Sequence, residues 1–250
     1  MSRVDRRPAK VVFFDAGGTL LDPVEPVADT YLRFAREFAP TLDPQGFNDH
    51  FRAAWRGLNE NFRSRSPDGE TSEALEKEAW FQFTRAVADP FGVLRDQHET
   101  WLARLVEYFD RGESWRLVPE AQNVLTELRS RGLKLAVVSN WHDILESILI
   151  HHGLADQLDA IVISSRVGRK KPHREIFTHG LDQFGLSASE GVHVGDSWEE
   201  DCVGAIKAGM QAVHFDRTRG PEADPAGICL ESKPTLPVIR SLGELPGLLP

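Results

Sequence analysis

Residues 11–22, VVFFDAGGTLLD, decide how the fold begins. Four β-branched or aromatic residues come first, a pattern typical of a buried strand, and the glycines that follow end the strand in a turn. The strand ends on Asp15. A carboxylate beside such an apolar run loses hydration, which costs free energy unless the group is used. We therefore expect Asp15 to have a function.

The segment from about residue 23 to residue 111 has a helical pattern. Apolar residues recur at intervals of three and four, and a Pro, Asp, Ser or Thr stands near each expected start. The pattern contains no convincing strand, and a polar connection lies at 63–72. It predicts four helices, over 27–38, 44–58, 72–88 and 95–109.

After residue 115 expected strands and helices alternate. The strands are predicted at 133–140, 159–164, 191–197 and 211–216, and the helices at 117–132, 142–153, 173–185 and 199–209, with a short terminal helix near 242–249. This alternation implies a parallel sheet with helices on both faces. The predicted fold class is α/β, a Rossmann-like doubly wound parallel sheet core with an inserted four-helix cap domain.

The expected domain boundaries follow from this pattern. Residues 1–21 hold the first strand and its loop, 22–111 form the helical cap, and 112–250 supply the remainder of the core. An insertion directly after the first strand leaves the sheet at its carboxyl edge, where ligands bind in open α/β folds. The helical segment is therefore expected to act as a lid.

Composition excludes several classes of protein. A net charge of -9 argues against a general affinity for nucleic acid or an anionic membrane. No apolar run approaches the roughly 20 residues of a membrane span, and the start has no signal-peptide pattern. Two cysteines are too few for a disulfide framework. We expect a cytoplasmic protein, monomeric or homodimeric, that binds neither nucleic acid nor membrane.

Polar residues stand where the predicted strands end. Besides Asp15 they are Ser139 and Asn140, Lys171 in GRKKP at 168–172, and Asp196 in GDSWEED at 195–201. Asp15 and Asp196 together could hold Mg²⁺, which prefers hard oxygen ligands. A carboxylate beside that cation can attack phosphorus. Lys171 would offset the remaining charge, while Ser139 and backbone N–H groups of the glycine turn would bind phosphoryl oxygens.

Four motifs, in order, resemble those of the haloacid dehalogenase (HAD) superfamily. They span residue 10 to about residue 215, nearly the whole chain. The insertion resembles the helical cap of the subfamily whose cap follows the first motif. The motifs are Asp15 with Gly18-Thr19-Leu20, Ser139-Asn140, Lys171-Pro172, and Gly195-Asp196-Ser197 with Asp201.

The resemblance implies a role for each matching residue. Asp15 would be the nucleophile and form an aspartyl intermediate, and Lys171 would bridge the transferring group to it. Mg²⁺ would be held by Asp15, the backbone carbonyl of Gly17, and Asp196. Asp201 would orient Lys171 or a metal-bound water. The residues expected to bind substrate are Gly18, Thr19, Ser139, Asn140 and Lys171, with Thr19 also bracing the first loop.

One residue of the family pattern is missing. Phosphatases of this superfamily usually carry a second aspartate two residues after the nucleophile, which protonates the leaving oxygen and then activates water. Here that position is Gly17. Loss of a general acid/base typically costs roughly 10² to 10⁴ in rate. A replacement donor could come from His142, from His98, or from the substrate.

Three functions remain open on these residues. The favoured one is a Mg²⁺-dependent phosphatase acting on a small phosphorylated metabolite, with activity weakened by Gly17. The second is a phosphometabolite-binding or partner-binding protein with vestigial catalysis. The third is a 2-haloacid dehalogenase, since halide leaves without a proton. Dehalogenases of this family usually lack the acidic metal ligand found here as Asp196, which favours phosphoryl chemistry.

Substrate specificity is expected to come from the cap. Arg56, Asn59 and Arg63 on the second predicted helix are candidates for contact with an anionic substrate. Trp141 and Trp198 directly follow the second and fourth motifs, so they could line the entrance.

Overall fold

The centre of the protein is a parallel β-sheet. The computed structural model describes residues 8–65, 68–217 and 236–249, without the side chains of 59–65. In this part of the chain the sheet has six strands in the order β5-β4-β1-β6-β7-β8, and every neighbouring pair is parallel. The strands are β1 (Val11–Phe14), β4 (Lys134–Ser139), β5 (Ala160–Ile163), β6 (Gly191–Gly195), β7 (Gln211–Phe215) and β8 (Val238–Ile239). The predicted α/β sheet is confirmed, and β8 is an additional strand.

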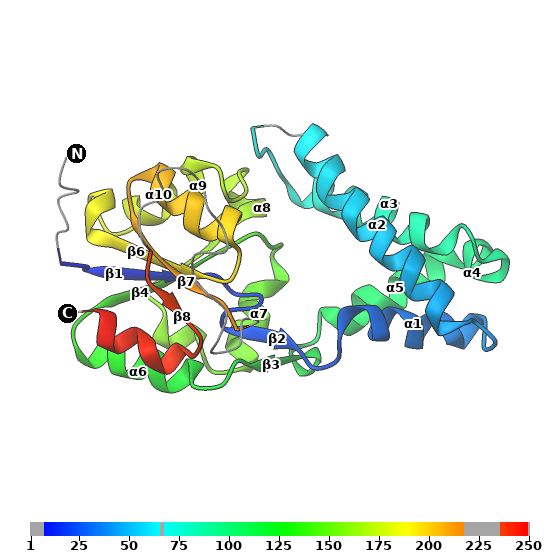
Figure 1. Ribbon diagram of the computed structural model, residues 1–250, viewed down its shortest axis with the longest axis horizontal. Helices are drawn as coiled ribbons and strands as arrows, with labels where there is room; N and C mark the ends of the chain where they lie inside the picture. Colours follow the sequence, from blue (N-terminus) through cyan, green and yellow to red (C-terminus); the bar gives the residue numbers. More distant parts are fainter. Residues whose placement is uncertain (1–7, 66–67, 218–235, 250) are drawn as a thin grey trace.

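Helices cover both faces of this sheet (Figure 1). One face carries α6 (Ala121–Ser130), α7 (Ile144–His151) and the 3-10 helix η6 (Leu242–Leu248). The other carries α9 (Arg174–Asp182), the π-helical turn η4 (Trp198–Val203) and α10 (Gly204–Ala208), with the short α8 (Ser164–Val167) after β5. The helix predicted over 199–209 is thus divided into η4 and α10. Among the described residues, the other 3-10 turns are η1 (Gly112–Ser114), η2 (Ala155–Gln157) and η3 (Ala188–Glu190).

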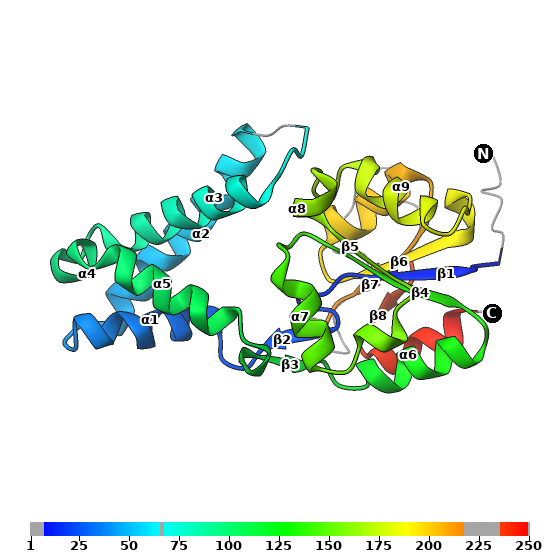
Figure 2. The ribbon, with the colours of Figure 1, turned by 180° about the vertical axis from the view of Figure 1, so that it is seen from behind.

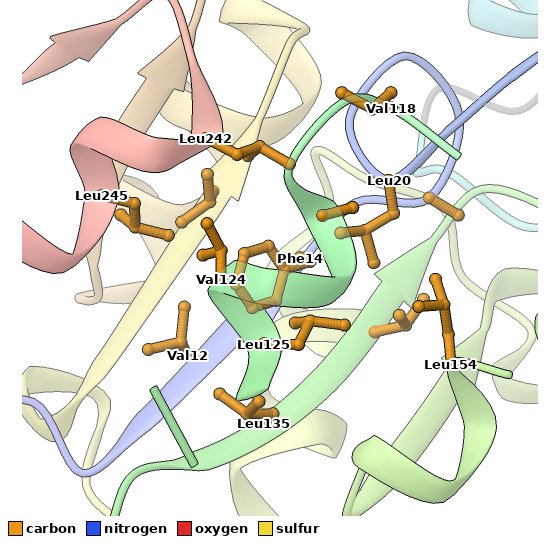
Figure 3. Packing of buried hydrophobic residues seen from close by; sticks show 14 of the residues in the cluster. Val12, Phe14, Leu20, Val118, Val124, Leu125, Leu135, Leu154, Leu242 and Leu245 are labelled. Carbon is orange, nitrogen blue, oxygen red and sulfur yellow. The ribbon is translucent and has the colours of Figure 1, made fainter. Parts of the chain in front are cut away.

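The alternation of side chains along β1 builds two cores. Val12 and Phe14 point into the cluster shared with α6 and η6, while Val11 and Phe13 point into the cluster on the opposite face. Figure 3 shows Phe14 packed among residues of α6. All four β1 side chains are buried, and a fully buried side chain of this size stabilises the fold by about 1.5–3 kcal/mol. The strand that carries Asp15 is therefore held rigidly from both sides.

A block of helices with its own core stands beyond the carboxyl ends of the strands (Figures 1 and 2). Its buried apolar residues, among them Tyr31, Phe47 and Trp101, form a third cluster drawn only from this block. The structure shows five helices here where four are predicted, because Gln97 interrupts the expected helix over 95–109. The five are α1 (Val27–Phe38), α2 (Pro44–Arg65), α3 (Glu73–Ala88), α4 (Gly92–Asp96) and α5 (His98–Phe109).

Two short strands connect the block to the sheet. β2 (Leu21–Pro23) pairs antiparallel with β3 (Trp115–Leu117). The sequence pattern does not predict either strand, because three residues are too few to show an alternation. The helix expected over 117–132 is correspondingly shorter and begins only at Ala121, after β3 and Pro119. Among the described helices, none is both long and apolar enough to cross a bilayer.

Candidate active site

Four polar side chains meet where the strands end. Lys171 places its Nζ 2.7 Å from Oδ1 of Asp15 and 2.6 Å from Oδ1 of Asp201. The Ser139 hydroxyl, at the end of β4, donates to the same Asp15 oxygen over 2.8 Å. Each of these residues is at most 9% exposed. An ammonium group therefore lies between two carboxylates in a site largely shielded from water.

Asp201 is held by the π-helical turn η4. Its Oδ2 accepts the backbone N–H of Ser197 over 2.9 Å, and its Oδ1 lies 2.8 Å from Nε2 of His193. Gly195 makes this approach possible, because a Cβ there would lie only 2.2 Å from Cγ of Asp201. Both carboxylate oxygens of Asp201 are thus engaged inside the protein. One of these contacts holds the ammonium of Lys171.

His193 is a member of this network that the sequence does not predict. It is fully buried on β6, and burial lowers the pKa of its imidazole. The ring is therefore neutral at pH 7, so Nε2–H donates to Asp201, while Nδ1 has no hydrogen-bond partner in the described part of the chain. A histidine inside the buried stretch GVHVG is the signal that could have indicated it.

Asp196 lies at the end of β6 against the loop that follows Asp15. A Cβ on Gly18 would lie 2.6 Å from Oδ2 of Asp196, and Gly18 has a φ of +77°. Only glycine satisfies both conditions. As a result, one carboxylate oxygen each from Asp15, Asp196 and Asp201 lie within 4.8 Å of one another. Asp15 and Asp196, which are 181 positions apart in the chain, are thus brought into one acidic cluster.

The charges in this cluster shift the pKa values of its members. Burial raises the pKa of Asp15, and Lys171 offsets part of the rise. Asp196 is exposed on one side, but partial burial of its carboxylate, together with Asp15 and Asp201, raises its pKa to about 7. Burial alone would lower the pKa of Lys171 and raise that of Asp201, yet Asp15 and Asp201 raise the first, and Lys171 with His193 lowers the second. Lys171 therefore stays charged beside ionised Asp201.

A divalent cation fits this arrangement. Three carboxylates lie around the ammonium of Lys171, and burial together with the charges of Asp15 and Asp201 raises the pKa of Asp196. Asp201 has both oxygens engaged. Asp15 and Asp196 are thus the carboxylates available to a cation, and their hard oxygen atoms suit Mg²⁺.

The position of the missing acid is covered by an indole ring. A Cβ on Gly17 would lie 3.2 Å from Cζ3 and 3.9 Å from Cη2 of Trp141. The backbone of Trp141 is fixed in turn, since its N–H donates to the Ser164 hydroxyl over 3.1 Å. The space beside Gly17 is therefore apolar.

Asn140 contacts the backbone of Lys171, which belongs to residues 168–172, here called the lysine segment. Its Oδ1 accepts the N–H of Lys171 over 2.7 Å, and its Nδ2 donates to the Lys171 carbonyl over 3.0 Å and to Glu200 over 3.1 Å. The sequence predicts a substrate-binding side chain at Asn140, but its amide is engaged within the protein. It acts here by positioning Lys171.

The glycine turn is also placed differently from the prediction. The Gly18 N–H, expected to bind phosphoryl oxygens, donates to the Leu21 carbonyl over 2.8 Å. The Thr19 hydroxyl, expected to bind substrate, is fully buried and lacks a hydrogen-bond partner within the described ranges. The turn is instead braced by Arg217, which donates to the Gly18 carbonyl over 2.9 Å and pairs with both carboxylate oxygens of Asp22 at 2.7 Å.

A cleft of about 1720 Å³ separates this site from the helical block. Core residues on its floor include Asn140, Trp141 and Lys171, and block residues on its walls include Tyr31, Trp55 and Trp80. Pockets for small ligands typically measure about 300–1,000 Å³, so this cleft has room for a substrate larger than inorganic phosphate.

The other sequence candidates divide between the cleft and the cores. Trp141 and His142 line the cleft, but Trp198 packs against the core cluster and lies 5.6 Å, ring to ring, from His214.

His98 is buried in the helical block, where Nε2 lies 2.8 Å from the Thr84 hydroxyl, so it is not a proton donor for this site. Arg56 is exposed and is not among the cleft-lining residues. The side chains of Asn59 and Arg63 lie outside the described residues.

One connection of the helical block reaches across the cleft to the lysine segment. The N–H of Thr71 donates to the Gly168 carbonyl over 3.2 Å, and the N–H of Lys170 donates to the Gly69 carbonyl over 2.8 Å. The Lys170 ammonium also lies 2.8 Å from Oε1 of the buried Glu76. We call this pairing of residues 69–71 with 168–170 the cleft bridge. It joins the block directly to the residue next to Lys171.

Fold and site together define a phosphatase-like hydrolase built on an α/β core. The model of the haloacid dehalogenase-like hydrolase family matches residues 9–209, and the chain belongs to this family.

Known proteins of similar length support this assignment. The chain is 30% identical to the haloacid dehalogenase-like hydrolase domain-containing protein 3 of Bos taurus, over 98% of this chain and 94% of the relative. It is 28% identical to a ribulose-1,5-bisphosphate 5-phosphatase of Halopiger xanaduensis, over 96% and 99% of the two chains. The magnesium-bound HAD hydrolase YfnB of Bacillus subtilis shares the fold, with a TM-score of 0.71 at 20% identity over 97% and 99%.

Proposed function

We propose that this protein is a Mg²⁺-dependent phosphomonoester hydrolase that acts on a small phosphorylated metabolite through an aspartyl-phosphate on Asp15. The observation that carries the proposal is the 2.7 Å contact between Lys171 Nζ and Asp15 Oδ1 within the acidic cluster, with Lys171 itself lining the cleft. Relatives with phosphatase names support the phosphoryl chemistry.

The residues of the site have distinct tasks in this proposal. Asp15 attacks phosphorus, because the buried strand β1 holds its carboxylate rigidly beside Lys171. Lys171 and Ser139 contact Asp15 and bind the oxygens of the transferring group. Asp196, Asp15 and the Gly17 carbonyl would hold Mg²⁺, which when bound neutralises phosphoryl charge.

The helical segment 22–111 functions as a cap in the same proposal, with residues 1–21 and 112–250 forming the core. The helices share a core of their own and face the site across the cleft. A cap over this cleft would exclude water from the intermediate. The cytoplasmic location and the monomeric or homodimeric state stay predictions from the sequence.

The test is phosphate release from a panel of phosphomonoesters with Mg²⁺ or with EDTA. We expect weak release that requires Mg²⁺ and is abolished in Asp15→Asn. The matched control is Asp182→Asn, because Asp182 is exposed at the end of α9 and is not a member of the acidic cluster. A covalent phosphoenzyme that is trapped by acid and cleaved by hydroxylamine would identify the acyl phosphate.

The two alternatives give different results in the same assay. A wild-type protein that is inert on the panel but binds vanadate would be a phosphometabolite-binding protein. Metal-free release of chloride from a 2-chloro acid would indicate a dehalogenase. Either result would contradict the proposed phosphatase.

A further inference from the structure

The position that usually carries the general acid next to Asp15 has no proton donor here. Position 17 has no side chain, and the indole of Trp141 fills the space where one would begin, with Cζ3 3.2 Å from the Cβ position. Trp141 packs edge-to-face on Trp115 at 4.7 Å between ring centroids. The Trp115 indole N–H donates to the Phe109 carbonyl over 2.9 Å, and the Trp141 atoms that adjoin position 17 are ring carbons.

This apolar surface restricts the leaving group. When the P–O bond breaks without a general acid, the leaving oxygen must carry the electron pair as an anion. A phenol with a pKa of about 10 tolerates this charge far better than an aliphatic alcohol, whose pKa is close to the roughly 15.7 of water. The site therefore favours an ester oxygen attached to an aromatic ring.

The lining of the cleft supplies a second observation. Seven of the lining side chains are large aromatic residues, and we call them the aromatic wall: Tyr31, Trp55, Trp80, Phe81, Phe109, Trp115 and Trp141. They connect the helical block to the reaction site, because Tyr31 contacts Phe109 at 5.8 Å and Phe109 contacts Trp115 at 6.0 Å between centroids. At the far end, Trp55 contacts Trp80 at 5.9 Å. Aromatic pairs add about 0.5–1.5 kcal/mol beyond the area that they bury.

From these observations we propose that the substrate is a phosphate monoester of an aromatic alcohol. The inference rests on the proposed function and names the substrate class of that site. The phosphoryl group lies at Asp15 and Lys171, and the aromatic group lies on the aromatic wall beside Trp141. Because Lys171 is the buried cation at the cleft floor, the charged and the apolar ends of such a molecule each meet a matching surface.

The proposed reaction has two steps, formation and hydrolysis of the aspartyl-phosphate. A bond forms between Asp15 and phosphorus while the bond from phosphorus to the phenolic oxygen breaks, and the phenolate leaves with the electron pair. Water then forms a bond to phosphorus, the acyl phosphate bond breaks to restore the Asp15 carboxylate, and one proton passes to the solvent. No donor at position 17 is needed for the first step.

The test compares three substrates of equal charge: phenyl phosphate, cyclohexyl phosphate and benzyl phosphate. Phenyl and cyclohexyl phosphate match in size, and benzyl phosphate keeps the aromatic ring but leaves as an aliphatic alcohol. We expect kcat/KM for phenyl phosphate to exceed that for the other two by about 10²- to 10⁴-fold, the usual contribution of a general acid. In Gly17→Asp the ratio should fall below about tenfold, and Gly17→Asp with Trp141→Leu provides the same acid with more space.

A binding measurement isolates the aromatic wall from catalysis. Asp15→Asn should bind phenyl and benzyl phosphate about three- to tenfold more tightly than cyclohexyl phosphate in titration calorimetry, consistent with the strength of aromatic contacts. Adding Trp141→Leu or Trp115→Leu should remove this preference. Circular dichroism and unfolding curves show whether each variant remains folded.

The outcomes are distinct. Hydrolysis of cyclohexyl phosphate within threefold of phenyl phosphate, or equal binding of all three esters, would overturn the aromatic substrate while the phosphatase stands. Mg²⁺-independent release, or none from any ester, would overturn the proposed function and this inference with it.

Discussion

At the residue scale, Lys171 compensates the negative charge of the buried carboxylates in the site. It is 3% exposed and lies between the carboxylates of Asp15 and Asp201. Removing one partner of a buried ion pair leaves charge without compensation, which typically costs 3–5 kcal/mol. The side chain that contacts Asp15 in the proposed site is therefore also expected to stabilise the fold.

This dual role leads to a prediction for Lys171→Met. At pH 8 in EDTA we expect the free energy of unfolding to fall by about 3–5 kcal/mol, because Asp15 and Asp201 lose their shared cation. Guanidinium unfolding measures the change. Lys207→Met is the control, since Lys207 is an exposed cleft residue and its loss should change stability by less than about 0.5 kcal/mol. Equal effects of the two substitutions would contradict the ion-pair account.

Gly17 leads to a kinetic prediction at the same scale. The position offers no group to activate water in the second step, so breakdown of the aspartyl-phosphate should be slower than its formation from a good leaving group. With 4-nitrophenyl phosphate in stopped flow we expect a burst of nitrophenol equal to the enzyme concentration. Gly17→Asp should shorten or abolish the burst. A linear trace from the first turnover at saturation would show that the first step limits the rate.

At the element scale, the cleft bridge connects the helical block to the lysine segment. Two backbone hydrogen bonds join residues 69–71 to 168–170, and the largely buried pair Lys170–Glu76 supports them. A movement of the block away from the core must break these contacts. The bridge therefore couples closure of the cleft to the position of the segment that carries Lys171.

The bridge can be tested by hydrogen exchange. In Glu76→Gln the ion pair with Lys170 is weakened by about 1–2 kcal/mol, so the amides of Thr71 and Lys170 should exchange roughly tenfold faster. Mass spectrometry of the peptides covering these residues measures this. Glu78→Gln is the control, since Glu78 lies in the same helix but bonds only to Gln82 among the contacts described. Unchanged exchange at both amides would show that the ion pair does not support the bridge.

At the scale of the whole molecule, the acidic cluster links stability to pH and to Mg²⁺. Because the pKa of Asp196 is raised from 3.8 to about 7, the folded protein binds more protons than the unfolded chain between these values. Its contribution to stability therefore falls as the pH rises through this window, and the penalty is complete above pH 7. A bound cation would relieve the penalty.

We therefore expect Asp196→Asn to raise Tm in EDTA at pH 8 and to have little effect at pH 4. Mg²⁺ should raise Tm of the wild type at pH 8 but not that of the variant, because the substitution removes a ligand. Differential scanning fluorimetry over a pH series measures both effects. Asp182→Asn, on the exposed end of α9, is the control. An equal Mg²⁺ response in Asp196→Asn would remove this residue from the proposed metal site.

The sequence by itself determined the elements and the candidate residues. Apolar runs such as VVFF are local signals, so the strands and the insertion after β1 can be predicted without a structure. The order of the motifs likewise places Asp15, Ser139, Lys171 and Asp196 at one edge, because parallel strands end together. These conclusions depend only on chain neighbours and on the rules of sheet topology.

Only the tertiary structure decided where each side chain points and what it contacts. Asn140 turns toward the backbone of Lys171, His193 joins Asp201 from inside the sheet, and Trp141 covers Gly17. Contacts of this kind arise between residues far apart in the chain, so no local pattern encodes them. Packing selects them, because buried polar groups must find partners and apolar rings must fill the remaining space.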